Sequence, residues 1–288
     1  MKTLIEAFNR DGFIVLEDVI DPAHCDILCE KMLADVDAIL KRPGVPFNFN
    51  KGNIQQTPPP FAPYLFEDVF FNPKIIDVTK AILGPGVKNN FYSGNTALPG
   101  EHYQPVHPDV AQLWQGLEHA TPTFGMVINV PVVDMGPENG ATQLWPGTHK
   151  DTHYFHGDGS ARVADQHLAL WREKAPPIQP MVRRGSVLLR DIRLWHAGMP
   201  NRTAQPRPMI AMIHWCGWFA DWDGIEIPER SCSFFENKAL HTNLKVVPDD
   251  QFDHIKHGGA YDVDLPPAAP PPTGVPSGPG SAKGETKA

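Results

Sequence analysis

The sequence predicts a mainly β protein with flanking helices, in which antiparallel strands form either a barrel or a double-sheet jelly roll. Two observations carry this prediction. Helical patterns of apolar residues are confined to the first third of the chain, and beyond about Lys88 the chain becomes a series of short apolar stretches separated by Gly, Pro and Asn. Many short strands after a helical start are typical of a β core with helices packed outside it.

The first third combines helices with one strand and one long loop. Leu4, Ile5 and Phe8 recur at helical spacing, and the following "GFIVLEDVI" is apolar and β-branched. Asp21 and Pro22 form a helix start, because aspartate caps the first turn and proline is tolerated at the first helical position. We expect, in order, a helix around residues 4–8, a strand at 12–20, a helix at 22–40, a loop at 41–63 and a helix at 72–84.

The next part of the chain supplies the candidate strands, each of them bounded by turn residues. They are "NNFYSGNTALPG", "YQPVHPDV", "PTFGMVINVPVV", "GATQLWPG", "GSVLLR", "LWHAGM" and "PMIAMIHWCGW". Residues 265–288, "LPPAAPPPTGVPSGPGSAKGETKA", contain no aromatic residue and cannot bury enough apolar surface to offset the entropy lost on ordering. We therefore expect one domain at 1–264 and a disordered tail at 265–288, with a proline-rich docking motif as the less favoured interpretation.

Charge and hydropathy argue against nucleic acid and membranes as partners. The 25 Lys and Arg against 33 Asp and Glu give a net charge of −8, and no basic cluster is long enough to follow a phosphate backbone. The N-terminal "MKTLIEAFNRDGF" lacks the apolar run of a signal peptide, and no later stretch resembles a membrane span. We expect a soluble, cytoplasmic protein whose four cysteines are reduced and mainly structural.

Four His-x-Asp triplets raise the question of a metal site: His24/Asp26, His107/Asp109, His149/Asp151 and His156/Asp158. With 13 histidines among 288 residues, chance alone produces about one such triplet. The first lies in an expected helix, where residues two apart point in nearly opposite directions. The last two lie in an expected loop, where no regular backbone fixes side-chain directions. His107 and Asp109 lie in an expected extended segment, where residues two apart project from the same face, and they are the best candidates.

A metal site needs a third ligand from a different strand. His196, in "LLRDIRLWHAGMPNR", stands at the end of a candidate strand and would complete a 2-His-1-carboxylate set, which leaves open positions on ferrous iron. By its local surroundings alone, a histidine beside Trp195 is more often a packed residue than a ligand.

Five segments, "DGFIVLEDVI", "VHPD", "ENGATQLWPGTHK", "GSVLLRDIRLWHAG" and "NRTAQPRPMI", occur in the order and spacing of a known family. Over roughly residues 11–210 the chain resembles the phytanoyl-CoA dioxygenase family of Fe(II)- and 2-oxoglutarate-dependent oxygenases. The resemblance implies a double-stranded β-helix, which is a cupin-like jelly roll. It also implies Fe(II) as cofactor, with 2-oxoglutarate and O2 as co-substrates.

By the same resemblance, His107, Asp109 and His196 are the catalytic iron ligands. Arg207, eleven residues after His196, matches the arginine that binds the distal carboxylate of 2-oxoglutarate. A guanidinium group suits this role because it is permanently charged and grips a carboxylate with two parallel hydrogen bonds. Arg190, Arg193 and Arg202 do not match that position.

Two further residues are candidates for contact with 2-oxoglutarate. Gln104 matches a glutamine that helps to hold the co-substrate in related proteins, and Thr142 in "NGAT" brings a hydroxyl to the same region. A purely structural hydrogen bond is the alternative for each. His149, in the shared block "PGTHK", lies outside the ligand set and is expected to be structural.

The resemblance predicts a dioxygenase that oxidises a small, largely apolar metabolite, in specialised-metabolite biosynthesis. Hydroxylation is the simplest outcome, with desaturation, epoxidation and rearrangement left open, and the carboxylate at Asp109 disfavours halogenation. Candidate pocket walls are the loop "NIQQTPPPF", the segment "VAQLWQGLEH" and the tryptophans of "HWCGWFADWDG", which are Trp215, Trp218 and Trp222. The alternatives are a cupin-type isomerase or oxygenase without 2-oxoglutarate, a non-catalytic binding protein, and an acyl-CoA hydroxylase. A homodimer is left open.

Overall fold

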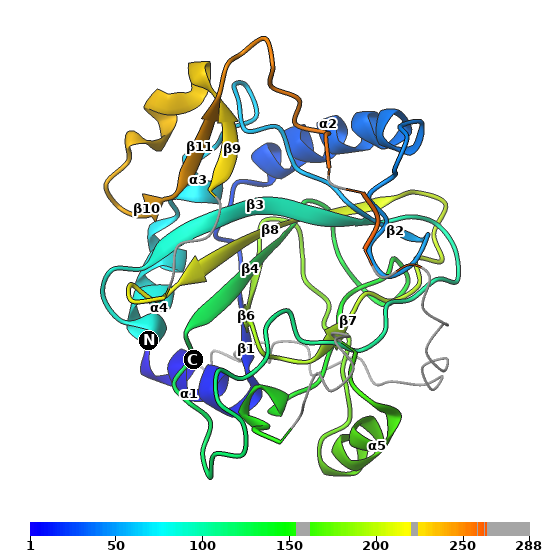
Figure 1. Cartoon of the computed structure of the whole chain (residues 1–288), viewed down its shortest axis with the longest axis vertical. Coiled ribbons are helices and arrows are strands. Elements are labelled where there is room, and N and C mark those ends of the chain that lie inside the picture. Colours follow the sequence, from blue (N-terminus) through cyan, green and yellow to red (C-terminus); the bar gives the residue numbers. More distant parts are fainter. Residues whose placement is uncertain (154–161, 220–223, 258, 262, 264–288) are drawn as a thin grey trace, which may run out of the picture.

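The computed structural model describes residues 1–153, 162–219, 224–257, 259–261 and 263. Its centre is a seven-stranded sheet (Figure 1) in the order β1-β6-β4-β8-β3-β10, with β2 also paired to β3. These strands are β1 (Phe13–Leu16), β2 (Asn53–Gln55), β3 (Lys88–Ala97), β4 (Gly125–Pro131), β6 (Val187–Asp191), β8 (Arg207–Trp215) and β10 (His241–Thr242). All of the pairs are antiparallel except β10 with β3.

Two small sheets accompany the large one. β5 (Gln143–Leu144) pairs antiparallel with β7 (His196–Ala197), and β9 (Ile225–Pro228) pairs parallel with β11 (Leu244–Val247). An isolated bridge between His107 and His196 extends the β5–β7 sheet toward the segment that follows β3. The large sheet and the extended β5–β7 sheet are the two layers of a jelly roll, and β9–β11 is a separate small sheet.

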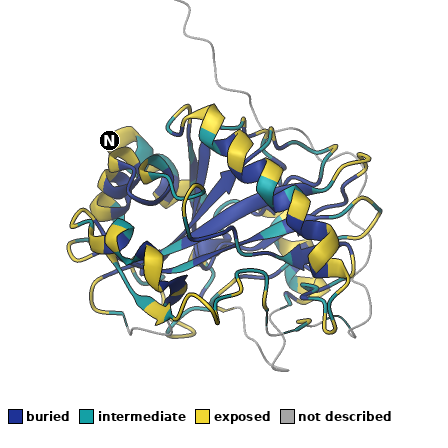
Figure 2. Cartoon of the chain, turned by 90° about the horizontal axis from the view of Figure 1, so that it is seen from above, coloured by how far each residue is buried: buried dark blue, intermediate teal, exposed yellow. Residues whose placement is uncertain are grey.

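Helices cover the outer face of the large sheet. Phe70 packs on Tyr92 of β3 with ring centroids 4.3 Å apart, and Thr79 lies 3.1 Å from His214 of β8. Figure 2 shows the buried strands between helices whose exposed faces turn outward. The helices of the described chain are α1 (Lys2–Asp11), α2 (Pro22–Leu40), α3 (Glu67–Phe70), α4 (Pro73–Leu83), α5 (Asp165–Lys174) and the 3-10 segments η1 (Thr148–Lys150) and η2 (Glu229–Glu236). Of these, α5 lies near β7 instead, where its Trp171 packs on Trp195 with ring centroids 5.9 Å apart.

The predicted mainly β class with flanking helices is confirmed. The predicted helices exist, and Asp21 caps α2 by accepting a hydrogen bond from the backbone N–H of Ala23. The expected strand at 12–20 is shorter, since β1 ends at Leu16, and the expected loop at 41–63 contains β2. The segment "YQPVHPDV" is not a regular strand, since within it only His107 forms a bridge.

Several elements were not predicted, namely the helices α3 and α5, the 3-10 segments η1 and η2, and the strands β9, β10 and β11. The expected tail at 265–288 lies outside the described residues. None of the helices within the described ranges combines the length and the apolar character that a membrane span requires. The four cysteines are free thiols, of which Cys25, Cys29 and Cys216 are buried.

Candidate metal centre and its pocket

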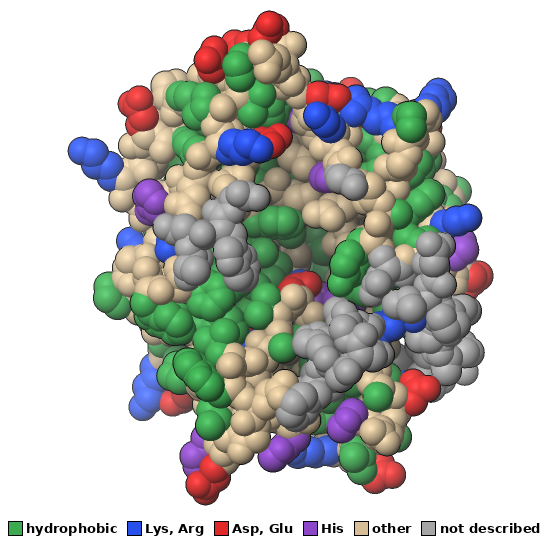
Figure 3. Space-filling view, in the orientation of Figure 1, with side chains coloured by type: hydrophobic (Ala, Val, Ile, Leu, Met, Phe, Trp, Pro, Cys, Tyr) green, Lys and Arg blue, Asp and Glu red, His purple; other side chains and the backbone are tan. Residues whose placement is uncertain are grey.

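A pocket of about 490 Å3 lies on the inner face of the large sheet, where β3, β4, β6 and β8 contribute to its wall. Figure 3 shows a hollow near the centre of the molecular surface in view, and acidic and histidine side-chain atoms are visible in this hollow. His107, Asp109, His196, Gln104, Thr142 and Arg207 all line this one pocket. The structure thus brings together every site residue that was predicted from the sequence.

The backbone aligns the two histidines. The N–H of His107 donates to the carbonyl of His196, and the N–H of His196 donates to the carbonyl of His107, both at 2.9 Å. Residues that exchange both hydrogen bonds across antiparallel segments project their side chains to the same side. Consequently the two rings lie with their centroids 4.4 Å apart.

Asp109 reaches the same point through a bend in the backbone. Its N–H donates to the carbonyl of Ile192 at 3.2 Å, which places the segment after His107 beside the end of β6. One carboxylate oxygen, Oδ1, lies 3.6 Å from Nε2 of His196. The two residues of this His-x-Asp triplet therefore converge, although not through the strand alternation that the spacing suggested.

Together the three side chains form a group in which one ligand atom from each lies within 4.8 Å of the others. Within the described ranges, it is the one such group of three or more His, Cys, Asp or Glu residues. His24, of another triplet, instead pairs with Asp68 at 2.9 Å. His156 and Asp158 lie outside the described residues.

Hydrogen bonds orient both rings for metal binding. Nδ1 of His107 lies 2.8 Å from the carbonyl oxygen of Pro105, and Nδ1 of His196 lies 3.0 Å from that of Leu194. A carbonyl only accepts, so each Nδ1 carries the proton, and the Nε2 lone pair remains for a metal. Burial, followed for His196 by the charge of Arg190, lowers the pKa of both rings, which favours this neutral form. The donor set therefore fits ferrous iron.

The charge of Asp109 is fixed by its neighbours. Desolvation in the pocket would by itself raise the pKa of its carboxyl group, but mainly the positive charge of Arg190 outweighs this effect and lowers the pKa well below the usual range. Arg190 reaches the second carboxylate oxygen, Oδ2, at 2.7 Å. Asp109 is therefore an anion before any metal arrives.

Arg207 begins β8 and is almost completely buried, at 3% exposure. Its Nε and Nη2 donate to the carbonyls of Asn139 and Gly140 at 3.2 and 2.6 Å. Its Nη1 has no partner among the described residues, and burial lowers its pKa to about 10. A buried guanidinium with an unsatisfied N–H in the pocket fits a bound carboxylate. The two parallel bonds predicted from the sequence would need Nη1 together with the second N–H of Nη2.

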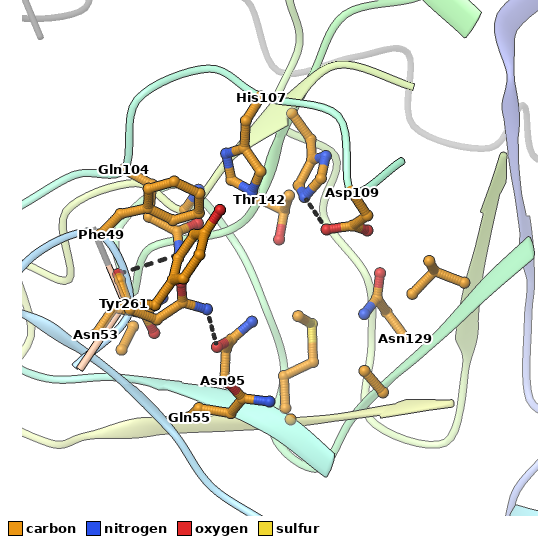
Figure 4. A pocket seen from close by; sticks show the side chains of 18 of the residues that line it. Phe49, Asn53, Gln55, Asn95, Gln104, His107, Asp109, Asn129, Thr142 and Tyr261 are labelled. Carbon is orange, nitrogen blue, oxygen red and sulfur yellow. Dashed lines mark hydrogen bonds and ion pairs between the residues drawn. The ribbon is translucent and has the colours of Figure 1, made fainter. Parts of the chain in front are cut away.

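Gln104 and Thr142 differ in whether their polar side-chain atoms already form hydrogen bonds within the protein. The amide oxygen of Gln104 accepts from the N–H of Gly198 at 2.8 Å, and its amide nitrogen donates to the carbonyl of Asn48 at 3.4 Å. These bonds favour the structural alternative for Gln104, which nevertheless lines the pocket. Thr142 is 5% exposed and faces the pocket near His107 (Figure 4).

Phe49, Tyr261 and Arg190 are among the pocket residues that were not identified from the sequence as part of the site. The ring of Phe49 packs on His107 with centroids 4.2 Å apart and meets Tyr261 edge to face at 5.1 Å. Phe49 has a φ of 62°, a strained conformation for a bulky side chain, and its N–H donates to the carbonyl of Tyr261 at 2.8 Å. The end of the described chain thus folds back over the pocket.

The remaining walls divide into a polar and an apolar part. Figure 4 shows the amide side chains of Gln55 and Asn95 across the cavity from His107. The apolar part contains Phe91, Val127, Ile192, Ile213 and Trp215. Trp218 is 69% exposed and is not part of the lining, whereas Trp222 lies outside the described residues.

His149 lies away from the pocket, as expected of a structural residue. It is buried at 3% exposure, and its ring centroid lies 6.5 Å from that of Phe8 in α1. A Cβ added at Gly12 would approach its Nδ1 to 2.5 Å, so the turn after α1 and this ring are closely packed.

Comparison with known proteins places these features in context. A family described as phytanoyl-CoA dioxygenase (PhyH) matches residues 8–209. A relative named dioxygenase andF, from Emericella variicolor, is 23% identical over 195 residues, which cover 62% of this chain and 64% of that relative. The chain therefore spans less than two thirds of that relative's length.

Solved structures share the fold at low sequence identity. The structure of AviO1 from Streptomyces viridochromogenes is 20% identical, covers 76% of this chain and 96% of its own, and superposes with a TM-score of 0.57. The epimerase SnoN, in complex with Fe3+, alpha ketoglutarate and nogalamycin RO, is 16% identical, covers 77% of this chain and 93% of its own, and has a TM-score of 0.56.

Proposed function

Because the chain belongs to the phytanoyl-CoA dioxygenase family, we propose that it is an Fe(II)- and 2-oxoglutarate-dependent dioxygenase that oxidises a small, neutral metabolite. The single observation that carries the proposal is the convergence of His107, Asp109 and His196 in one pocket with a buried Arg207 that retains an unused N–H. Bound iron and 2-oxoglutarate would supply the oxidising power, with 2-oxoglutarate converted to succinate and carbon dioxide. Hydroxylation is the simplest outcome of this chemistry.

The chain itself binds, orients and excludes water. His107 and His196 each offer a neutral Nε2, and Asp109 offers one negative charge, so together they hold a dication with a net charge of +1. Arg207 meets the distal carboxylate of 2-oxoglutarate through Nη1. The apolar wall keeps water away from the reacting centre, which is the main contribution of a protein to cofactor chemistry of this kind.

The pocket lining supports a neutral substrate. Its charged side chains are Asp109, Arg190 and Arg207, and in the proposed state each of them has a partner in the metal, the co-substrate or the others. Among the described residues that line the pocket, a substrate anion would therefore meet no unpaired cation. Amide groups on one wall and apolar groups on the other suit a mainly apolar molecule that carries hydroxyl or carbonyl oxygens, as specialised metabolites do. The net charge of −8 disfavours an acyl-CoA, whose phosphates need a basic patch.

The test is succinate formation from 2-oxoglutarate by anaerobically purified protein that is loaded with ferrous iron and then exposed to oxygen. His107→Ala and Arg207→Ala should both abolish iron-dependent succinate. Arg202→Ala is the matched control, because Arg202 binds Glu101 on the surface and is half-exposed.

Some oxygenases of this type need their substrate before they react with oxygen, so the binding of 2-oxoglutarate is measured in parallel. The readout is the visible charge-transfer band of the ferrous enzyme. Absence of both succinate and this band in iron-loaded wild type would contradict the proposal and favour a jelly-roll metalloprotein that has no use for Arg207.

A further inference from the structure

Arg190 stands in an unusual position for a charged residue. It lies in β6, "VLLRD", in which every residue is buried, and it is itself 5% exposed. Arginine is almost never buried to this extent without a partner, because removing its charge from water is costly. Its position in the fold therefore has to be explained by what the guanidinium contacts.

Two of its nitrogens bind side chains of other segments, and one of these side chains belongs to the three candidate metal ligands. Nη2 lies 2.7 Å from Oδ2 of Asp109, and Nε donates to Oδ1 of Asn129 at 3.1 Å. Asn129 lies on β4, the neighbour of β6 in the sheet, so a second strand holds the guanidinium that binds the carboxylate. The third nitrogen, Nη1, is 3.5 Å from Nδ1 of His196, whose proton is already donated to Leu194.

As a result, the two oxygens of the Asp109 carboxylate have different neighbours. Oδ2 is occupied by Arg190, whereas Oδ1 lies 3.6 Å from Nε2 of His196. A carboxylate that is free to turn can bind a metal through one oxygen or through both. With one oxygen held, only the other is directed at the metal.

We propose that Arg190 is a positioning residue that restricts Asp109 to one metal-facing oxygen and so keeps coordination positions available for 2-oxoglutarate. The proposal rests on the proposed function. An octahedral ion with three protein ligands retains three further positions, of which a chelating 2-oxo acid needs two. If Asp109 turned to bind through both oxygens, one of these positions would be lost.

The test separates metal binding from 2-oxoglutarate binding in the full-length protein. Co(II) affinity is measured by calorimetry on the metal-free protein, and its visible absorption reports the coordination number. The affinity for 2-oxoglutarate is measured anaerobically from the charge-transfer band of the Fe(II) protein. Arg190→Gln removes the charge and cannot reach both partners, whereas Arg190→Lys keeps the charge but not the forked geometry. Arg202→Gln is the surface control.

For Arg190→Gln we expect 2-oxoglutarate affinity to fall by about tenfold or more, a loss as large as outer-shell changes commonly cause in metal affinity or activity. Co(II) affinity should change by less than about threefold, because a second bond from Asp109 to the metal would offset the lost outer-shell partner. Arg190→Lys should show a smaller loss of about threefold in 2-oxoglutarate affinity at unchanged Co(II) affinity. If the glutamine variant does not fold, the lysine variant decides. Wild-type 2-oxoglutarate affinity in a folded variant, or a parallel loss of both affinities, would overturn the proposal.

Failure of the proposed function would look different. In that case wild type would bind Co(II) without binding 2-oxoglutarate, and the Co(II) spectra alone would decide the role of Arg190. A higher coordination number in the glutamine variant supports the restriction of Asp109 to one oxygen. Identical spectra in the variant and in wild type overturn it.

Discussion

Two arginine–aspartate pairs, Arg193–Asp191 and Arg190–Asp109, meet at the end of β6 and differ in how completely the carboxylate is used. Asp191 is fully buried at 0% exposure. Its Oδ1 accepts from Nε and from the backbone N–H of Arg193, and its Oδ2 accepts from Nη2 of Arg193 and from the hydroxyl of Thr123. Asp109, by contrast, has one oxygen held by Arg190 and the other directed toward His196.

The difference separates an ion pair that only stabilises the fold from an ion pair that can also bind a ligand. A buried carboxylate whose acceptor sites are all taken has nothing left for a ligand, and its role is confined to the fold. The Asp109 carboxylate keeps one oxygen without an arginine partner, and this oxygen lies beside two neutral imidazoles. It can therefore offer its negative charge to a bound cation. The number of unused acceptor sites, more than burial or the presence of an arginine, marks the functional pair.

The largest expected effect comes from breaking the saturated pair. Asp191→Ala should lower the free energy of unfolding by about 3–5 kcal/mol, because it leaves the Arg193 charge buried and unpaired. Chemical denaturation measures this change. The control is Asp249→Ala, which breaks the exposed pair with Arg230 and should cost less than about 1 kcal/mol. Equal losses in the two variants would show that Asp191 is not a structural anchor.

The unsaturated pair should show the reverse pattern. Asp109→Ala is expected to reduce iron-dependent succinate formation by about 100-fold or more, beyond the loss typical of outer-shell changes. The unfolding free energy of the metal-free protein should fall by less than in Asp191→Ala, because Arg190 then opens onto pocket water. Strong destabilisation with retained succinate formation would reverse the two assignments.

Acidic pH provides a third way to sharpen the comparison, through His149, which interacts with both members of the saturated pair. Burial lowers its pKa from 6.5 to about 4, so the unfolded state takes up the proton first. The stabilising effect of a neutral His149 is therefore complete above pH 6.5 and is lost progressively as the pH falls toward 4.

We expect this one residue to contribute a slope of about 1 kcal/mol per pH unit near pH 5 in the free energy of unfolding. Denaturation of wild type and His149→Gln between neutral pH and pH values near 5 measures the slope. The variant should give a flatter profile, since other titrating groups are common to both proteins. Parallel profiles would mean that folding does not shift the pKa of His149.

The smallest effects should come from the outer partners of the two pairs. Gln112 accepts from Nη1 of Arg193 at 3.0 Å, and Asn129 accepts from Nε of Arg190 at 3.1 Å. Gln112→Ala should lower stability by about 1–2 kcal/mol and leave 2-oxoglutarate binding unchanged. Asn129→Ala should weaken 2-oxoglutarate binding by a few-fold at a smaller cost in stability. The two variants, measured by denaturation and by the charge-transfer band, should thus differ in which property changes.

The sequence predicted which side chains converge better than it predicted the reason for their convergence. The spacing of His107 and Asp109 suggested strand alternation, whereas the structure shows a bridge from His107 to His196 followed by a bend held by Ile192. Those contacts join segments far apart in the chain, so no local pattern reveals them. The short strand β2 was missed for a similar reason, since "NIQ" has little β propensity of its own and depends on pairing with β3.

Arg190 could have been noticed. A charged residue within the mainly apolar "SVLLRDI" indicates a buried partner, but the family resemblance assigns a role to Arg207 and none to Arg190. Tyr261 offered no such signal, because its contact with Phe49 depends on how the whole domain closes. A site residue can therefore be predicted from the sequence when its chemical type differs from that of its neighbours in the chain. It cannot be predicted when only the tertiary fold gives it a role.

The hydrogen bond from the N–H of Phe49 to the carbonyl of Tyr261 also has a consequence for biosynthesis. A ribosome that makes this chain delivers Phe49 early and Tyr261 only after β8 has been completed, and at ordinary rates of synthesis the interval is roughly 10 to 40 s. Until then the Phe49 N–H lacks the carbonyl that holds its strained backbone. The nascent chain also presents His107 and Asp109 well before His196. The finished pocket can therefore form only after Tyr261 has been made, when the pocket receives its last wall.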